Sequence, residues 1–253
     1  MPAYVSHTIM ARDVYEKINN KNVNLDYMIT FSLGGDLSKY AKCRRDSHRI
    51  KKDEFIFNMC DYMKKNKLIN DSECLGVLYG HICHMIMDDV MHPLIRKVDK
   101  ICDDRKRDHT LIEGYIDSYL VKYKYKKTID KYDNKVLFKG KINKKIKDMI
   151  DCVYNETYNT KHVSRYYKFN IFLYKKIKYL YKIFGVNLLK KISGFNKFIK
   201  KNKNIDIFNN DNRVCYINYI GFKENENVIN LYNESVLLAK LYIDNINKYL
   251  RIE

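Results

Sequence analysis

Proline and glycine are scarce along this chain, which has two prolines and nine glycines among its 253 residues. Both residue types interrupt helices and supply the tight turns that join short strands, and dipeptides typical of β-hairpins are scarce as well. The sequence therefore predicts an all-α fold. Hydrophobic residues make up 46% of the chain, enough for a sizeable core, and no linker or internal repeat is evident. We expect one multi-helix domain spanning residues 1–253.

Apolar residues recur at helical spacing in several segments. A first helix is predicted from Ser6, as its N-cap, to about Asn19, with His7 in its first turn. Pro93 is expected to kink or end its helix, because proline lacks an amide donor and crowds the preceding turn. Other helices are predicted at 53–65, from Asn70 or Asp71 to about 98, from near Asp108, and at 140–158, 162–184, 186–202 and 228–250.

The cysteines and the N-terminus bear on the compartment. Seven cysteines are an odd number and none forms a C-x-x-C pair, so we interpret them as reduced core thiols. The first residues lack the basic and apolar pattern of a signal peptide, and charges interrupt every apolar run before it reaches the length of a transmembrane helix. The sequence predicts a cytoplasmic protein.

The formal net charge of +18 predicts attraction to polyanions: nucleic acid, an anionic membrane surface or phosphate-bearing substrates. Abundant Lys, Asn, Ile and Tyr offer a second explanation, an A/T-rich coding sequence. Residues 161–203 contain thirteen Lys or Arg, no acidic residue and many aromatics. This segment either stacks bases or sits at a membrane interface, or it forms helices with one buried and one solvated face.

Four of the seven histidines fall between residues 81 and 109. His84, Asp88 and His92 are spaced four residues apart, so they share one stripe of a helix. His109 and Glu113 repeat this spacing on the next predicted helix. Imidazole nitrogens and carboxylate oxygens are good zinc ligands, although a single His–carboxylate pair on a helix is more often a capping or solubility feature. The joint pattern favours a metal site.

Further landmarks are His7 in the first helix, the loop L-G-G-D ending at Asp36, the lone His48, and the segments GHICHMIMDDVMHPLI and HTLIEGYIDSYL. Together these residues resemble the zinc-dependent phospholipase C family, whose fold is shared with single-strand-specific zinc nucleases, and the segment HICHMIMDDVMHPLI resembles its intracellular branch. The resemblance covers residues 2 to about 120 and, weakly, the segment NLYNESVLLAKLYI. We expect Asp36 and His48 on loops, because Gly34 and Gly35 allow irregular backbone.

The resemblance implies two or three zinc ions. One would be held by Asp36, His48, His84 and Asp88, and Asp88 would bridge to a second zinc on His7 and the N-terminal amine, which is that of Pro2 if Met1 is removed. A third zinc would take His92, His109 and Glu113. His81 has no counterpart in the family, so we assign it as a core or supporting residue and His84 as the ligand, with an exchange of the two left open.

Three functions follow as hypotheses. The leading one is a phospholipase C-like phosphodiesterase, in which a metal-bound hydroxide attacks the phosphoryl group and Asp36 and Asp88 are the catalytic carboxylates. A phospholipid is the favoured substrate. Contact with an anionic membrane surface fits the net positive charge of the chain. The second is a single-strand nuclease on the same site. The third is a non-catalytic protein whose helices are stapled by zinc. The oligomeric state stays open.

Overall fold

The computed structural model describes residues 4–44, 50–101, 109–127, 132, 138–173 and 225–252. Every regular element within them is helical, which confirms the all-α prediction. Residues 163–173 are also helical. The named helices are α1 (Tyr4–Lys17), α2 (Leu25–Phe31), the 3₁₀ turns η1 (Gly34–Ser38) and η2 (Lys42–Arg44), α3 (Lys52–Lys65), α4 (Ser72–Ile101), α5 (His109–Tyr125), α6 (Lys144–Tyr158) and α10 (Asn225–Leu250).

Side-chain caps explain where several helices begin. Asn24 Oδ1 accepts from the amides of Asp26 and Tyr27 at the start of α2, Asp71 caps α4, and Asn143 caps α6. The helices predicted at 53–65, from Asp71, and at 228–250 are confirmed within three residues at their starts, whereas α6 begins four residues later than predicted. The segments predicted helical at 174–184 and 186–202 lie outside the described residues.

The predicted start of the first helix is wrong. Ser6 is not its N-cap, because α1 already begins at Tyr4. The capping carboxylate comes from a distant residue: Asp117 of α5 accepts from the amides of Val5 at 3.2 Å and Ser6 at 2.6 Å, and from the Ser6 hydroxyl. This capping ties the first turn of α1, and with it His7, to α5.

Pro93 does not end its helix. α4 continues through it to Ile101, so the prediction of a helix end near Val98 is also three residues short. Proline removes one donor from the helix interior but leaves the backbone on either side helical.

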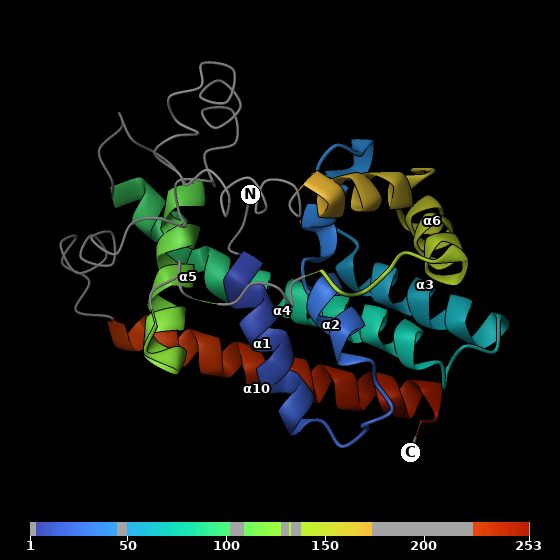
Figure 1. The fold of residues 1–253 in the computed structure, drawn as a ribbon, viewed down its shortest axis with the longest axis horizontal. Coiled ribbons are helices and arrows are strands. Elements are labelled where there is room, and N and C mark those ends of the chain that lie inside the picture. The colour runs from blue at the N-terminus through green and yellow to red at the C-terminus, as the bar shows by residue number, and fades with distance from the viewer. Residues whose placement is uncertain are drawn as a thin grey trace.

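Helix α4 is the centre of the molecule, because α2, α10, α1, α3 and α5 all pack against it. Figure 1 shows α10 along the lower edge, α1 crossing it, and α5 and α6 toward opposite ends of the molecule. α2 approaches α4 unusually closely at Gly76 and Gly80, where an added Cβ would lie 2.6 Å from the Asn24 carbonyl oxygen and 2.7 Å from that of Met28, respectively. These glycines allow backbone-to-backbone contact, and α2 therefore lies in a fixed position on α4.

The helical segment 163–173 has a buried and a solvated face, as one interpretation of the basic stretch predicted. Tyr167, Asn170 and Ile171 are buried, whereas Lys168 and Phe169 are exposed. The buried face packs against the part of the chain that follows α2, which brings it close to the candidate site.

Four of the five described cysteines are buried, as predicted for core thiols, whereas Cys152 is only partly buried. All five, Cys43, Cys60, Cys74, Cys83 and Cys152, are free. Cys102 and Cys215 lie outside the described residues. Among the helices that the structure describes, none combines the length and apolar character needed to cross a bilayer.

Candidate metal centre

Asp88 lies at the centre of a buried cluster on α4. Its Oδ2 is 3.6 Å from Nε2 of His84, one turn earlier, and its Oδ1 is 3.9 Å from Nδ1 of His92, one turn later. The spacing of four residues places all three side chains on one stripe, as predicted. The two oxygens of Asp88 thus face different histidines, the arrangement that a bridging carboxylate requires.

The first turn of α1 adds His7 to this cluster. His7 Nε2 is 3.3 Å from Oδ1 of Asp88, and its ring lies 4.7 Å from that of His84. Burial lowers the pKa of His7, but the hydrogen bond and charge of Asp88, assisted by Asp36, outweigh it and raise the pKa above its ordinary value. His7 Nδ1 is buried and has no hydrogen-bond partner among the described residues.

The η1 turn brings Asp36 to the same place. One ligand atom from each of His7, Asp36 and His84 lies within 4.8 Å of the others, and all three side chains are buried. Gly34 starts this turn with φ +38, and a Cβ on it would lie 2.4 Å from the His84 ring. Only glycine combines that left-handed backbone with so close an approach. The turn is therefore seated directly on His84.

Two residues of the 163–173 helix hold the η1 turn from the other side. The Tyr167 hydroxyl donates to the Gly34 carbonyl at 2.9 Å, and the Asn170 amide donates to the Leu37 carbonyl at 2.8 Å. Asp36 lies between these two anchored carbonyls in the sequence. The backbone around Asp36 is thus fixed by side chains more than 130 residues away.

Helix α5 contributes Glu113 at the far end of the stripe. His92 Nδ1 is 2.8 Å from the main-chain oxygen of Asp88, so this nitrogen carries the proton, and Nε2 faces Glu113 Oε1 at 3.6 Å. Burial lowers the pKa of His92, but the hydrogen bond to Glu113 and the charge of Asp88 raise it overall. In the neutral tautomer, Nε2 has the lone pair that a metal ion needs.

His81 is oriented away from the cluster. Its Nδ1 donates to the Val77 carbonyl at 2.9 Å, and its Nε2 is 3.1 Å from the Tyr167 hydroxyl, which also contacts Tyr154 at 2.8 Å. Burial lowers the pKa of His81 to about 4. Its two ring nitrogens therefore join the network that supports η1, and His84, not His81, faces Asp88.

The chemistry of the cluster fits divalent cations. Asp36, Asp88, Glu113 and the capping Asp117 are all less than 8% exposed. Burial raises the pKa of Asp117 to about 7, whereas the surrounding histidines overcome burial and hold that of Asp88 well below its usual range. Buried carboxylates are normally paired or bound to metal. Neutral imidazoles combined with carboxylates are a zinc donor set.

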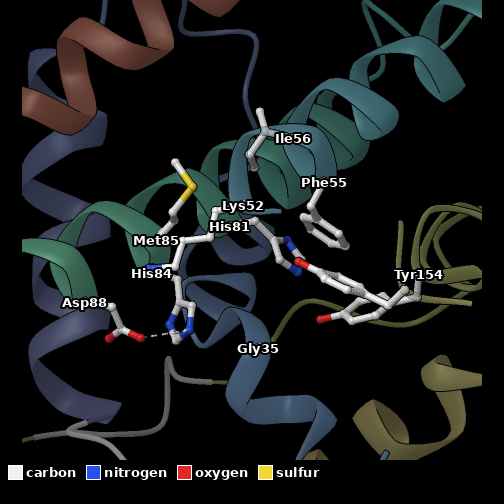
Figure 2. Close-up of a pocket in the computed structure, with 10 residues that line it drawn as sticks. Gly35, Lys52, Phe55, Ile56, His81, His84, Met85, Asp88 and Tyr154 are labelled. Carbon is white, nitrogen blue, oxygen red and sulfur yellow. Dashed lines mark ion pairs between the residues drawn. The ribbon is translucent and has the colours of Figure 1, made fainter. Parts of the chain in front are cut away.

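A small cavity of about 30 Å³ adjoins the cluster, large enough for a water molecule. Figure 2 shows His84 and Asp88 at one end, and Phe55, His81 and Tyr154 at the other. Lys52 also lines the cavity and pairs with Asp89 of α4. The cluster thus has an adjoining space with one cationic side chain on its wall.

Six of the eight predicted ligands come together: His7, Asp36, His84, Asp88, His92 and Glu113. His48 and the side chain of His109 lie outside the described residues. Sequence reasoning missed the supporting roles of Asp117, Tyr167 and Asn170, for which no local pattern exists. It also missed Gly76 and Gly80, although their G-x-x-x-G spacing on a predicted helix was a visible signal of close helix packing.

Comparisons with protein-family models, curated proteins and solved structures give no match to this chain.

Proposed function

We propose that this protein is a zinc-dependent phosphodiesterase of the phospholipase C kind. The observation that carries the proposal is the convergence of histidines and carboxylates from α1, η1, α4 and α5 around Asp88, beside a cavity. A structural zinc site normally uses four ligands and is closed. The candidate ligands here outnumber the four that one such site uses, which favours a centre with more than one ion.

The proposed ligands divide into neighbouring sets. Asp36, His48, His84 and Asp88 would hold one ion, His7 and Asp88 a second, and His92, His109 and Glu113 a third. Bound zinc ions would withdraw charge from a phosphoryl oxygen and lower the pKa of a water molecule. The Asp36 carboxylate would accept the proton that this water loses.

Lys52 is the proposed electrostatic partner of the phosphoryl group. It is the lysine on the cavity wall that also contains His84 and Asp88. An ammonium group in a partly buried site stabilises negative charge more strongly than one in water. We propose a phospholipid as the substrate class and the cytoplasm as the compartment, and the free thiols support a reducing environment.

The test is zinc content per chain, combined with hydrolysis of bis(p-nitrophenyl) phosphate before and after chelation. We expect two or three zinc ions and chelator-sensitive hydrolysis. Asp88→Asn should lose both, whereas Asp61→Asn, which alters an exposed carboxylate bonded to Tyr249, should keep both. If the protein binds zinc but hydrolyses neither this ester nor phospholipid nor a single-stranded oligonucleotide, the site is structural and not catalytic. Absence of zinc would refute the proposal.

A further inference from the structure

The outward face of the 163–173 helix carries exposed aromatic and basic side chains. Phe169 and Phe172 are 52% and 57% exposed, and Arg165 and Lys168 on the same helix are exposed too. Phenylalanine has no polar atom to leave in water, so two such rings on one helix face form an apolar surface.

Tyr40 extends this surface from a second segment. Its ring meets that of Phe169 edge-on at 5.9 Å, and Lys39 Nζ lies 5.6 Å from the centre of the Tyr40 ring. Tyr40 is 47% exposed. Segments 39–44 and 163–173 contain no acidic residue and five basic ones, Lys39, Lys42, Arg44, Arg165 and Lys168. We name Tyr40, Phe169, Phe172 and the basic residues Lys42, Arg165 and Lys168 the aromatic–basic face.

We propose that the aromatic–basic face docks on an anionic lipid membrane. Aromatic side chains insert at the boundary between headgroups and acyl chains, and basic residues beside them are attracted to anionic headgroups. The chain continues from this helix into residues 174–203, which hold ten further lysines and no acidic residue. A single-stranded nucleic acid is the weaker match, because it is bound in a groove that tracks its backbone, whereas this face is the solvent side of a helix.

The position of the face links it to the candidate centre. Its helix holds the η1 turn through Tyr167 and Asn170 on the opposite side. Docking would therefore bring the membrane to the element that fixes Asp36. Docking itself needs only the exposed rings and the basic side chains, so it does not depend on the proposed chemistry.

The experiment is cosedimentation of the full chain with phosphatidylcholine vesicles that contain or lack about one third phosphatidylserine. We expect binding to the phosphatidylserine vesicles that weakens as salt is added. The pair Phe169→Ser and Phe172→Ser should weaken it at least about tenfold, because both rings lose their apolar contact with lipid.

The matched control is Leu237→Ser with Leu241→Ser, which removes equally exposed apolar side chains from α10. Figure 1 shows α10 along the edge opposite the 163–173 segment, so this variant should bind vesicles like the parent. Both variants should hydrolyse the soluble ester like the parent, which separates docking from chemistry. Unchanged vesicle binding in the double phenylalanine variant would overturn the inference. It would also be overturned if the parent bound no vesicles but bound a single-stranded oligonucleotide, and if the double variant lost that oligonucleotide binding.

Discussion

Gly80→Ala tests how the close packing of α2 on α4 positions the candidate centre. In an ordinary helix this change stabilises, because alanine is favoured over glycine by about 1 kcal/mol. Here the new Cβ would lie 2.7 Å from the Met28 carbonyl oxygen and from the Phe31 carbonyl carbon. Both are backbone atoms of α2 and cannot rotate away.

The magnitude follows from these distances. An ordinary contact starts near 3.4 Å, so the end of α2 must move by roughly 0.7 Å in a packed interior. Overpacking of this kind costs about 1–3 kcal/mol, and the helix preference for alanine returns about 1. We therefore expect a net loss of up to about 2 kcal/mol in the free energy of unfolding, and no gain. Because Asp36 follows the displaced end of α2 by a few residues, zinc affinity should fall about tenfold.

The assay is urea denaturation of the metal-free protein, followed by zinc titration against a chromogenic chelator. Gly76→Ala is the matched control, because its Cβ meets the start of α2, 2.6 Å from the Asn24 carbonyl oxygen. It should cost similar stability but leave zinc affinity closer to that of the parent. A Gly80→Ala protein that is more stable than the parent would show that no clash with α2 occurs. Equal loss of zinc affinity in both variants would show that the displacement is not local.

Three further outcomes are expected. Tyr167→Phe removes the hydroxyl that holds the Gly34 carbonyl, so it should cost about 1–3 kcal/mol of unfolding free energy and weaken zinc binding. The control Tyr166→Phe should do neither. Unaltered zinc titration in the Tyr167→Phe protein would contradict the assigned role. Lys52→Met should lower the turnover of a phosphodiester about 10- to 100-fold with zinc content unchanged, and Lys51→Met, at an exposed pair with Glu54, should have no such effect. The pKa of His81 is about 6.5 in the unfolded chain and about 4 in the folded protein, so the unfolded state binds the extra proton and stability falls as the pH drops through this window. The free energy of unfolding should fall by about 2 kcal/mol between about pH 7 and pH 5. A His81→Phe protein that loses as much stability as the parent over this range would disprove the assignment.

The features that local spacing determines were predictable. Scarce proline and glycine implied long helices, and the periodicity placed α3, the start of α4, and α10 within a few residues. The stripe of His84, Asp88 and His92 follows from helix geometry alone. Glu113 was singled out by its spacing after His109, and His7 by the family resemblance alone. In the structure, each of the two contacts a residue of the α4 stripe.

The features that depend on distant contacts were not predictable in the same way. Ser6 looks like an N-cap by composition, but Asp117, 111 residues later in the chain, takes that role and lengthens α1 at its start. Tyr167 belongs to a stretch whose composition suggests only a basic amphipathic helix, yet its hydroxyl contacts Gly34 and His81 in the core. No residue pattern within a few positions of Ser6 or Tyr167 indicates such a distant partner.

A row of five residues on α4 also constrains which insertions and deletions this protein can accept during evolution. Gly76, Gly80, His84, Asp88 and His92 stand at intervals of four residues, the first two under α2 and the last three in the cluster. An inserted or deleted residue turns everything beyond it by about 100° around the helix axis. Point substitutions elsewhere on α4 leave the row intact, but a change of length inside it separates the helix contact from the ligands. Descendants of this gene should therefore align without gaps from Gly76 to His92, however far the rest of the sequence has diverged.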